Sequence, residues 1–227
     1  MAYPATQSVR RIEQCFLGLI TLGVAAVLAN HTVLGGALTS SIIIEDGPVE
    51  DLSAAVYLAA SIVGIWVGLK QARRFKSEAV LPLFAGLVAT LGFLDEVSFG
   101  ARLGWFNPPV LHDKPIDAVH DVFTVAYVMT REHLSGRALA TVVGCAGLVF
   151  VTVLVANRKR LDSITRMRGV RWLALAIALV VVAEVIDLDF FNKTGQWAFV
   201  YALEEVLEVN GGMALLCASL VHLMDRA

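Results

Sequence analysis

Long apolar runs separated by short polar segments make up most of this chain. A helix needs about 20 apolar residues to cross a hydrocarbon core about 30 Å thick, and six runs reach or approach that length. The pattern therefore predicts an all-α integral membrane protein with six transmembrane helices in a single membrane domain covering residues 1–227. The predicted spans are residues 14–38, 52–69, 79–99, 138–156, 171–188 and 197–222.

A shorter helix is expected between the third and fourth spans, at about residues 115–130. Pro115 suits a first helical turn, and Asp117, His120 and Asp121 would share one face. The segment is too short to cross the membrane, and both of its flanks are expected outside. We therefore predict a re-entrant or interfacial helix.

The composition supports membrane insertion. The chain is 57% hydrophobic and 17% charged, with mean hydropathy +0.72, which lies outside the range of soluble domains. The net charge of −2 gives no indication of a nucleic-acid partner. Cys15, Cys145 and Cys217 each lie in an apolar run, so we expect buried thiols and no disulfide framework.

Basic and acidic residues are sorted to opposite ends of the predicted spans. Of the 18 Lys and Arg residues, 13 lie before the first span, between the second and third, between the fourth and fifth, or after the sixth. The positive-inside rule then places both termini in the cytoplasm. Sixteen of the 20 acids lie on the outer side or in the outer half of a span.

Several of these acids lie inside the predicted spans. Counting 1.5 Å per residue from Ala79 places Asp95 roughly 24 Å into the membrane. An ionised acid facing lipid there would cost about 2.5–3.5 kcal/mol, so Asp95, Glu184, Glu204 and Glu208 together imply a cost on the order of 10 kcal/mol. We expect them to face inward and to be paired, protonated or bound to a cation.

Helical spacing groups these residues. Asp95, Ser98 and Arg102 would share a face if the third helix continued through them, and Glu184 and Asp187 would share a face of the fifth. Glu204 and Glu208 are one turn apart, with Glu205 turned about 100° away and expected to face elsewhere. Just beyond them, Gly211 and Gly212 would let another helix approach closely.

Two interpretations of this polar group remain open. Carboxylates with a histidine suit Zn²⁺ or Mn²⁺, and purely oxygen-lined sites suit Ca²⁺. In the alternative, Arg102 neutralises an acid in an internal network and the other acids hold protons. The candidate metal ligands are Glu50, Asp95, His120, Asp121, Glu184 and Glu208, and the candidate catalytic residues are Glu96, Ser98, Arg102 and Glu204.

Three motifs resemble a group of bacterial multi-pass membrane proteins. They are Glu45-Asp46-Gly47-x-x-Glu50, then Asp95-Glu96-x-Ser98-x-Gly100-x-Arg102, then His120-Asp121. Phe99 and Ala101 stand where that group usually has Trp and Gln, and Ala118-Val119-His120-Asp121 stands for Asn-Leu-His-Asn. The resemblance covers residues 42–125 and implies a fold, a topology and a location in the bacterial inner membrane, but no activity.

A weaker likeness is to membrane hydrolases that include alkaline ceramidases. It implies that Asp95, Ser98 and His120 could act with a zinc ion. That superfamily also has a late HxxxH pair, whereas the last span here offers only His222, at its cytoplasmic end.

Three functions are compatible with these patterns. The first is a metal-dependent hydrolase or transferase that acts on a lipid or lipid-linked substrate, with Glu96, Glu204 or Glu208 as general base. The second is a cation- or proton-coupled carrier, and the third is an accessory or scaffold subunit with protein partners in a larger membrane complex. Membrane lipid is the expected partner in each.

Overall fold

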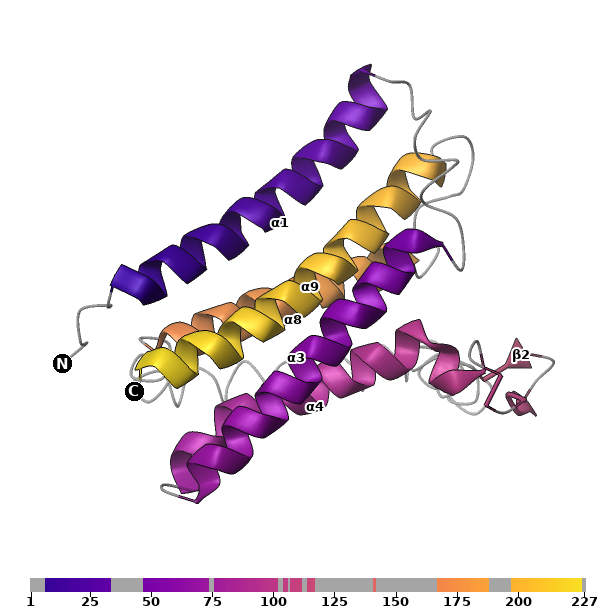
Figure 1. The fold of residues 1–227 in the computed structure, drawn as a ribbon. Coiled ribbons are helices and arrows are strands. Elements are labelled where there is room, and N and C mark those ends of the chain that lie inside the picture. Colours follow the sequence, from indigo (N-terminus) through magenta and orange to yellow (C-terminus); the bar gives the residue numbers. More distant parts are fainter. Residues whose placement is uncertain are drawn as a thin grey trace.

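The computed structural model describes the chain in nine pieces: residues 7–33, 47–73, 76–101, 104–105, 107–111, 114–116, 141, 167–187 and 197–225. In these residues the fold is helical apart from one two-stranded hairpin (Figure 1). The helices are α1 (Gln7–Val33), α3 (Pro48–Ala72), α4 (Lys76–Glu96), α8 (Arg168–Asp187) and α9 (Trp197–Asp225), and the strands are β1 (Val110–Leu111) and β2 (Lys114–Pro115).

Four of the described helices are long and apolar enough to cross a membrane: Gln7–Asn30, Pro48–Ala72, Ala79–Glu96 and Phe199–Met224. They correspond to the first, second, third and sixth predicted spans. The fifth predicted span is a helix, α8. The fourth, residues 138–156, lies outside the described residues apart from Thr141, so the count of six remains a prediction.

The ends of α3 follow from its sequence. Gly47 is extended at the N-cap and Pro48 follows at the start, where a missing N–H and a fixed φ suit the first turn. Glu50 and Asp51 lie in the first turn and Lys70 in the last, which matches the helix dipole at both ends.

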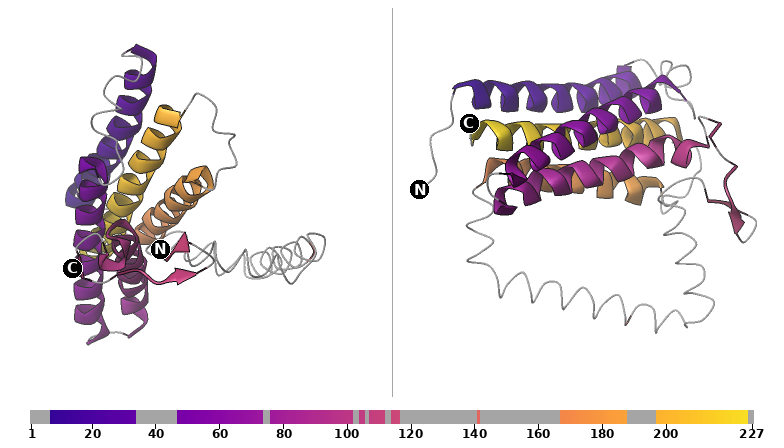
Figure 2. Two further views of the ribbon diagram at one scale, coloured as in Figure 1. Left: turned by 90° about the vertical axis from the view of Figure 1, so that its right-hand side faces the viewer. Right: turned by 60° about the horizontal axis from the view of Figure 1, so that its bottom comes forward.

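Helix α9 is the centre of the bundle. It packs against α1, α3, α4 and α8, and Figures 1 and 2 show it between α1 and α3. Within the spanning windows, 67% of α9 is buried against 11% of α1. The core along α9 consists largely of small side chains, which allow helix backbones to approach closely.

Glycines create the closest helix contacts. A Cβ on Gly64 of α3 would lie 2.7 Å from the Gly86 Cα of α4. The close approach predicted for Gly211 and Gly212 is confirmed, because a Cβ on Gly211 would lie 2.7 Å from Val180 of α8 and one on Gly212 would lie 3.0 Å from Val56 of α3.

The basic ends of the helices gather at one end of the bundle. The Arg168 Nη1 of α8 lies 2.8 Å from the Glu13 Oε2 of α1, and the Trp172 indole N–H donates to Glu13 at 3.3 Å. Nearby helix ends are joined by His222 Nε2 of α9 and Gln71 Oε1 of α3, 3.0 Å apart. We call this the basic end, and it carries Arg10, Arg11, Lys70, Arg73, Arg168 and Arg171.

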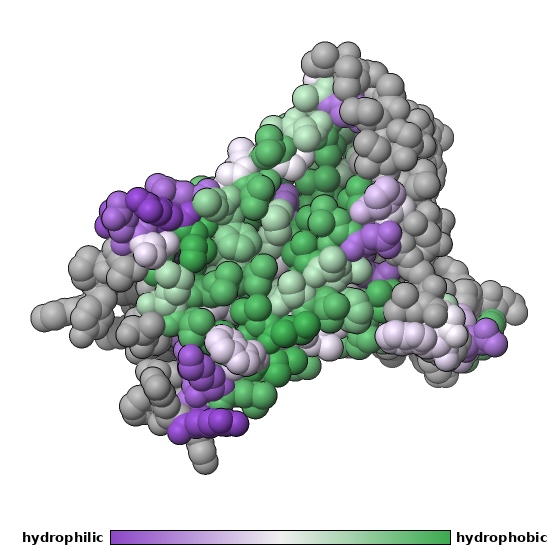
Figure 3. Space-filling model, viewed as in Figure 1, coloured by the Kyte–Doolittle hydropathy of each residue, from purple (hydrophilic) through white to green (hydrophobic). Residues whose placement is uncertain are grey.

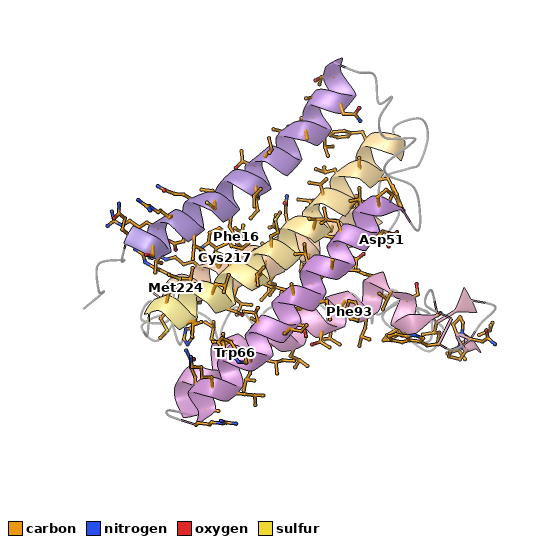
Figure 4. The ribbon with its side chains drawn as sticks, in the orientation of Figure 1. Phe16, Asp51, Trp66, Phe93, Cys217 and Met224 are labelled. Carbon is orange, nitrogen blue, oxygen red and sulfur yellow. The ribbon has the colours of Figure 1, made fainter. Side chains whose placement is uncertain are left out.

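The surface between the two ends is apolar. Figure 3 shows hydrophobic residues over the broad face of the helices, with hydrophilic residues gathered towards the ends. Asp51 lies near one end of α3, and Trp66 lies towards the other end (Figure 4). The structure therefore supports the predicted sorting of charge, and which end faces the cytoplasm remains a prediction.

Helix α4 ends earlier than its sequence predicts. The helix stops at Glu96, and after Val97 the chain has positive φ angles, 48° at Ser98, 51° at Phe99 and 95° at Gly100. The predicted shared face of Asp95, Ser98 and Arg102 is therefore wrong, because the helical repeat stops between the first two of them. Arg102 itself lies outside the described residues.

Two further predictions need correction. Pro115 lies in strand β2, paired with Val110, and so does not begin a helix there; residues 117–130 lie outside the described residues. Cys217 is buried as predicted, whereas Cys15 is exposed on α1, and Cys145 lies outside the described residues.

Candidate functional site

The best-defined polar contact at the end opposite the basic end joins α3 to α4. The Ser53 hydroxyl donates a 2.6 Å hydrogen bond to Glu96 Oε1. Ser53 is fully buried, so this donor is fixed by the packing around it. A short hydrogen bond of a hydroxyl to a carboxylate is about twice as strong as one between neutral groups, and it orients the Glu96 carboxyl group.

Carboxyl groups from three helices surround this contact. Glu96 interacts electrostatically with Glu205 of α9, Glu50 of α3 and its neighbour Asp95. Glu208 in turn interacts with Glu96, Glu205, Glu204 and Asp95. We call this group the acidic cluster; its members are Glu50, Asp95, Glu96, Glu204, Glu205 and Glu208.

Tyr201 adds a second hydroxyl to the acidic cluster. Its side chain forms a hydrogen bond with Glu205 one turn further along α9 and interacts with Glu50 and Glu204. Glu205 is only 4% exposed. The prediction that Glu205 faces elsewhere is therefore wrong. Because α9 packs against both α3 and α4, positions about 100° apart on it can face the same group of acids.

The local electrostatics of the acidic cluster are unfavourable for ionised acids on α4. Asp95 and Glu96 lie in the last turn of α4, where the helix dipole opposes negative charge, whereas Glu50 lies in the favourable first turn of α3. The outer turns of α3, α4 and α9 contain no Lys or Arg in their sequences. Shared protons or a bound cation would therefore stabilise the cluster.

The structure brings together five of the ten predicted site residues: Glu50, Asp95, Glu96, Glu204 and Glu208. Ser98 lies in the left-handed turn beyond α4, so it does not have the predicted position one turn from Asp95. Arg102, His120 and Asp121 lie outside the described residues.

Glu184 can be placed only by its backbone. It belongs to α8, one turn beyond Val180, which packs on Gly211 of α9. Its side chain, like that of Asp187, lies outside what the structure describes.

Two residues that contact the acidic cluster, Ser53 and Tyr201, were not predicted from the sequence as site residues. Both could have been found from helical spacing, since Ser53 is three residues after Glu50 and Tyr201 is four residues before Glu205. Hydroxyl residues are common in membrane helices, so only the contact with a carboxylate distinguishes these two.

A divalent metal site is not formed by the described residues alone. Among them, no three His, Cys, Asp or Glu side chains are placed to hold one metal ion. Three of the predicted ligands, Glu184, His120 and Asp121, have side chains outside the described residues. The structure thus gives a cluster of acids without a defined coordination site.

Comparisons with known proteins add no assignment. A scan against protein-family models and searches of curated proteins and of solved structures found no match to this chain. The site's chemistry must therefore be argued from its own residues.

Proposed function

We propose that this chain is a multi-pass membrane enzyme that hydrolyses, or transfers a group from, a lipid or lipid-linked substrate at the acidic cluster. The observation that carries the proposal is Glu96, which a buried serine orients among acids from three helices. Carboxyl groups close enough to influence one another can hold different protonation states, as acid and base catalysis requires.

Glu96 suits the role of general base. Ser53 donates to one of its carboxyl oxygens, which orients the group within the acidic cluster. In a hydrolysis, Glu96 would accept a proton from the attacking water, and a protonated neighbour such as Glu204 or Glu208 would donate one to the leaving group. The proton that Glu96 accepts balances the proton that its neighbour donates, so the cluster as a whole keeps the same number of protons.

Backbone strain beside Glu96 supports a functional site. Ser98 and Phe99 are both left-handed, which costs about 1–3 kcal/mol per residue. Such conformations concentrate at active sites and switch regions, where the surrounding structure maintains them.

The packing supports an enzyme over a carrier. A carrier needs access to its site from both sides of the membrane. Along the described α3–α4 seam, the polar contacts running inward from Ser53 reach the pair formed by Ser61 and Thr90, 2.7 Å apart. Beyond that pair, Gly64 and Gly86 bring the two backbones into direct contact, which leaves no room for a polar path along this seam.

The test is hydrolysis of membrane lipids by the purified protein. We expect the wild-type protein in lipid vesicles to release products detectable by mass spectrometry. Glu96→Gln should lose activity by about 10²-fold or more, as expected for a general base. Glu13→Gln is the matched control, since it makes the same substitution at the basic end and should keep full activity.

Two outcomes would contradict the proposal. One is a wild-type protein that leaves all lipids of its native membrane unchanged. The other is a folded Glu96→Gln variant that is as active as the wild type.

A further inference from the structure

The segment after α4 forms a compact turn that holds Trp105 in place. Backbone hydrogen bonds run from Gly100 N to Val97 O at 2.7 Å and from Trp105 N to Gly100 O at 3.0 Å. The indole lies directly over Gly100, where a Cβ would be only 2.5 Å from the ring. Trp105 is nevertheless 69% exposed, so the turn presents a fixed aromatic ring to its surroundings.

The hairpin that follows presents further apolar side chains. Val110 and Leu111 of β1 pair with Pro115 and Lys114 of β2, and Ile116 N donates to Pro109 O at 2.8 Å. Val110 is 67% and Leu111 40% exposed. Figure 1 and the right view of Figure 2 show the hairpin beyond the end of α4. We call Trp105, Val110 and Leu111 the hairpin surface.

An exposed apolar stripe also runs along α4, the helix that precedes the hairpin. Val80, Phe84, Leu87 and Leu91 are exposed at helical spacing along the spanning part of this helix. The stripe faces hydrocarbon if α4 crosses the membrane, so the turn after Glu96 reaches the membrane surface. In that case lipid would adjoin the hairpin surface.

A second exposed tryptophan lies towards the other end of the helix pair. Trp66 of α3 is 54% exposed, and the Lys70 ammonium group lies 5.1 Å from its ring centre (Figure 4). Tryptophans are enriched at both membrane–water interfaces, where the ring is partly buried and its N–H stays hydrated. Trp66 and Trp105 fit the two belts of one bilayer.

We propose that the hairpin surface binds the headgroup–acyl boundary of the leaflet on the side of the acidic cluster, with phospholipid as its partner. The exposed Trp, Val and Leu side chains suit the apolar side of that boundary, and the backbone polar groups of the hairpin suit its hydrated side. The contact would fix the depth of Glu96, which directly precedes the turn. This inference does not depend on the proposed activity, because a catalytically inactive protein would bind lipid in the same way.

The test measures the depth of Trp105 in vesicles by fluorescence. A full-length chain keeps Trp105 as its only tryptophan, with Phe at positions 66, 172 and 197. It is reconstituted in phosphatidylcholine carrying bromine near the top of the acyl chains or near their ends. We expect loss of most of the emission with the shallow bromines and a smaller loss with the deep ones.

Matched variants keep Trp66 or Trp172 instead. Trp66 should also be quenched by shallow bromines, whereas Trp172, which is 8% exposed and bonded to Glu13, should respond weakly to both lipids. Should the triple substitution impair folding, a Val110→Cys variant in which Cys15, Cys145 and Cys217 are replaced by Ser carries an environment-sensitive dye at position 110, retains all four tryptophans and should show a blue shift on reconstitution. Two results would overturn the inference. One is Trp105 emission that is quenched by iodide in the water but not by brominated lipid. The other is a dye at Val110→Cys whose emission does not shift.

Discussion

At the scale of single residues, two hydroxyl groups contact the acidic cluster. The Ser53 hydroxyl of α3 donates to Glu96 of α4, and Tyr201 forms a hydrogen bond with Glu205 one turn away on α9. At the basic end, by contrast, Arg168 forms an ion pair with Glu13 at 2.8 Å. Buried carboxyl groups held by hydroxyls keep the freedom to exchange protons, which a tight arginine pair would suppress.

The Ser53→Ala variant tests the role of this hydroxyl. We expect a loss of about 1–3 kcal/mol in unfolding free energy, because the buried Glu96 carboxyl loses its donor. Ser61→Ala is the control, since Thr90 keeps its bond to Gly86 O when Ser61 is lost, and the expected loss is about 0.5–1.5 kcal/mol. Denaturation in detergent measures both, and equal losses would show that Ser53 contributes only an ordinary hydrogen bond.

At the scale of helices, contact between glycines fixes the α3–α4 pair. Gly64 and Gly86 bring the backbones together where lipid offers no hydrophobic driving force for association. Packing of this kind is sensitive to a single added methyl group, because the nearest atoms belong to backbone and cannot rotate away.

The Gly64→Ala variant should therefore lose about 1–3 kcal/mol of stability, as overpacked cores do. Its added Cβ would meet Gly86 backbone atoms at 2.7 Å. Gly18→Ala is the matched control, because nothing lies within 4 Å of the new atom, and its higher helix propensity should keep or raise stability by up to about 1 kcal/mol. Thermal melting in detergent compares the two, and a stable Gly64→Ala variant would contradict the observed contact.

At the scale of the whole molecule, charge is separated along the bundle. The ends of α3, α4 and α9 that carry the acidic cluster lie opposite the ends that meet Arg168 and His222. The positive-inside rule turns this polarity into an orientation, with the basic end in the cytoplasm.

Reporter fusions test that orientation. A fluorescent protein fused after Ala227 should fold and fluoresce in a bacterial host, and alkaline phosphatase at the same position should be inactive. A chain ending at Gly47 with the same reporters is the control and should give the opposite result, because one span then precedes the fusion. An active phosphatase after Ala227 would contradict the predicted topology.

Much of the fold could be predicted from the sequence, because the membrane allows few structures to satisfy the backbone. Apolar runs of spanning length identified α1, α3, α4 and α9, and the cost of acids in hydrocarbon required Asp95 and Glu208 to face inward. Charge sorting along the chain also gave the two ends of the bundle, since α1 and α4 begin at the basic end and α3 and α9 finish there.

Only the tertiary structure determined which side chains meet. Glu205 joins the acidic cluster because α9 is covered by two helices at that level, and a helical wheel for α9 alone cannot show this. The early end of α4 was hidden as well, because Leu94 to Gly100 has no proline to end the helix. Spacing along one helix gives the direction of each side chain, whereas contacts between helices depend on packing that brings distant parts of the chain together.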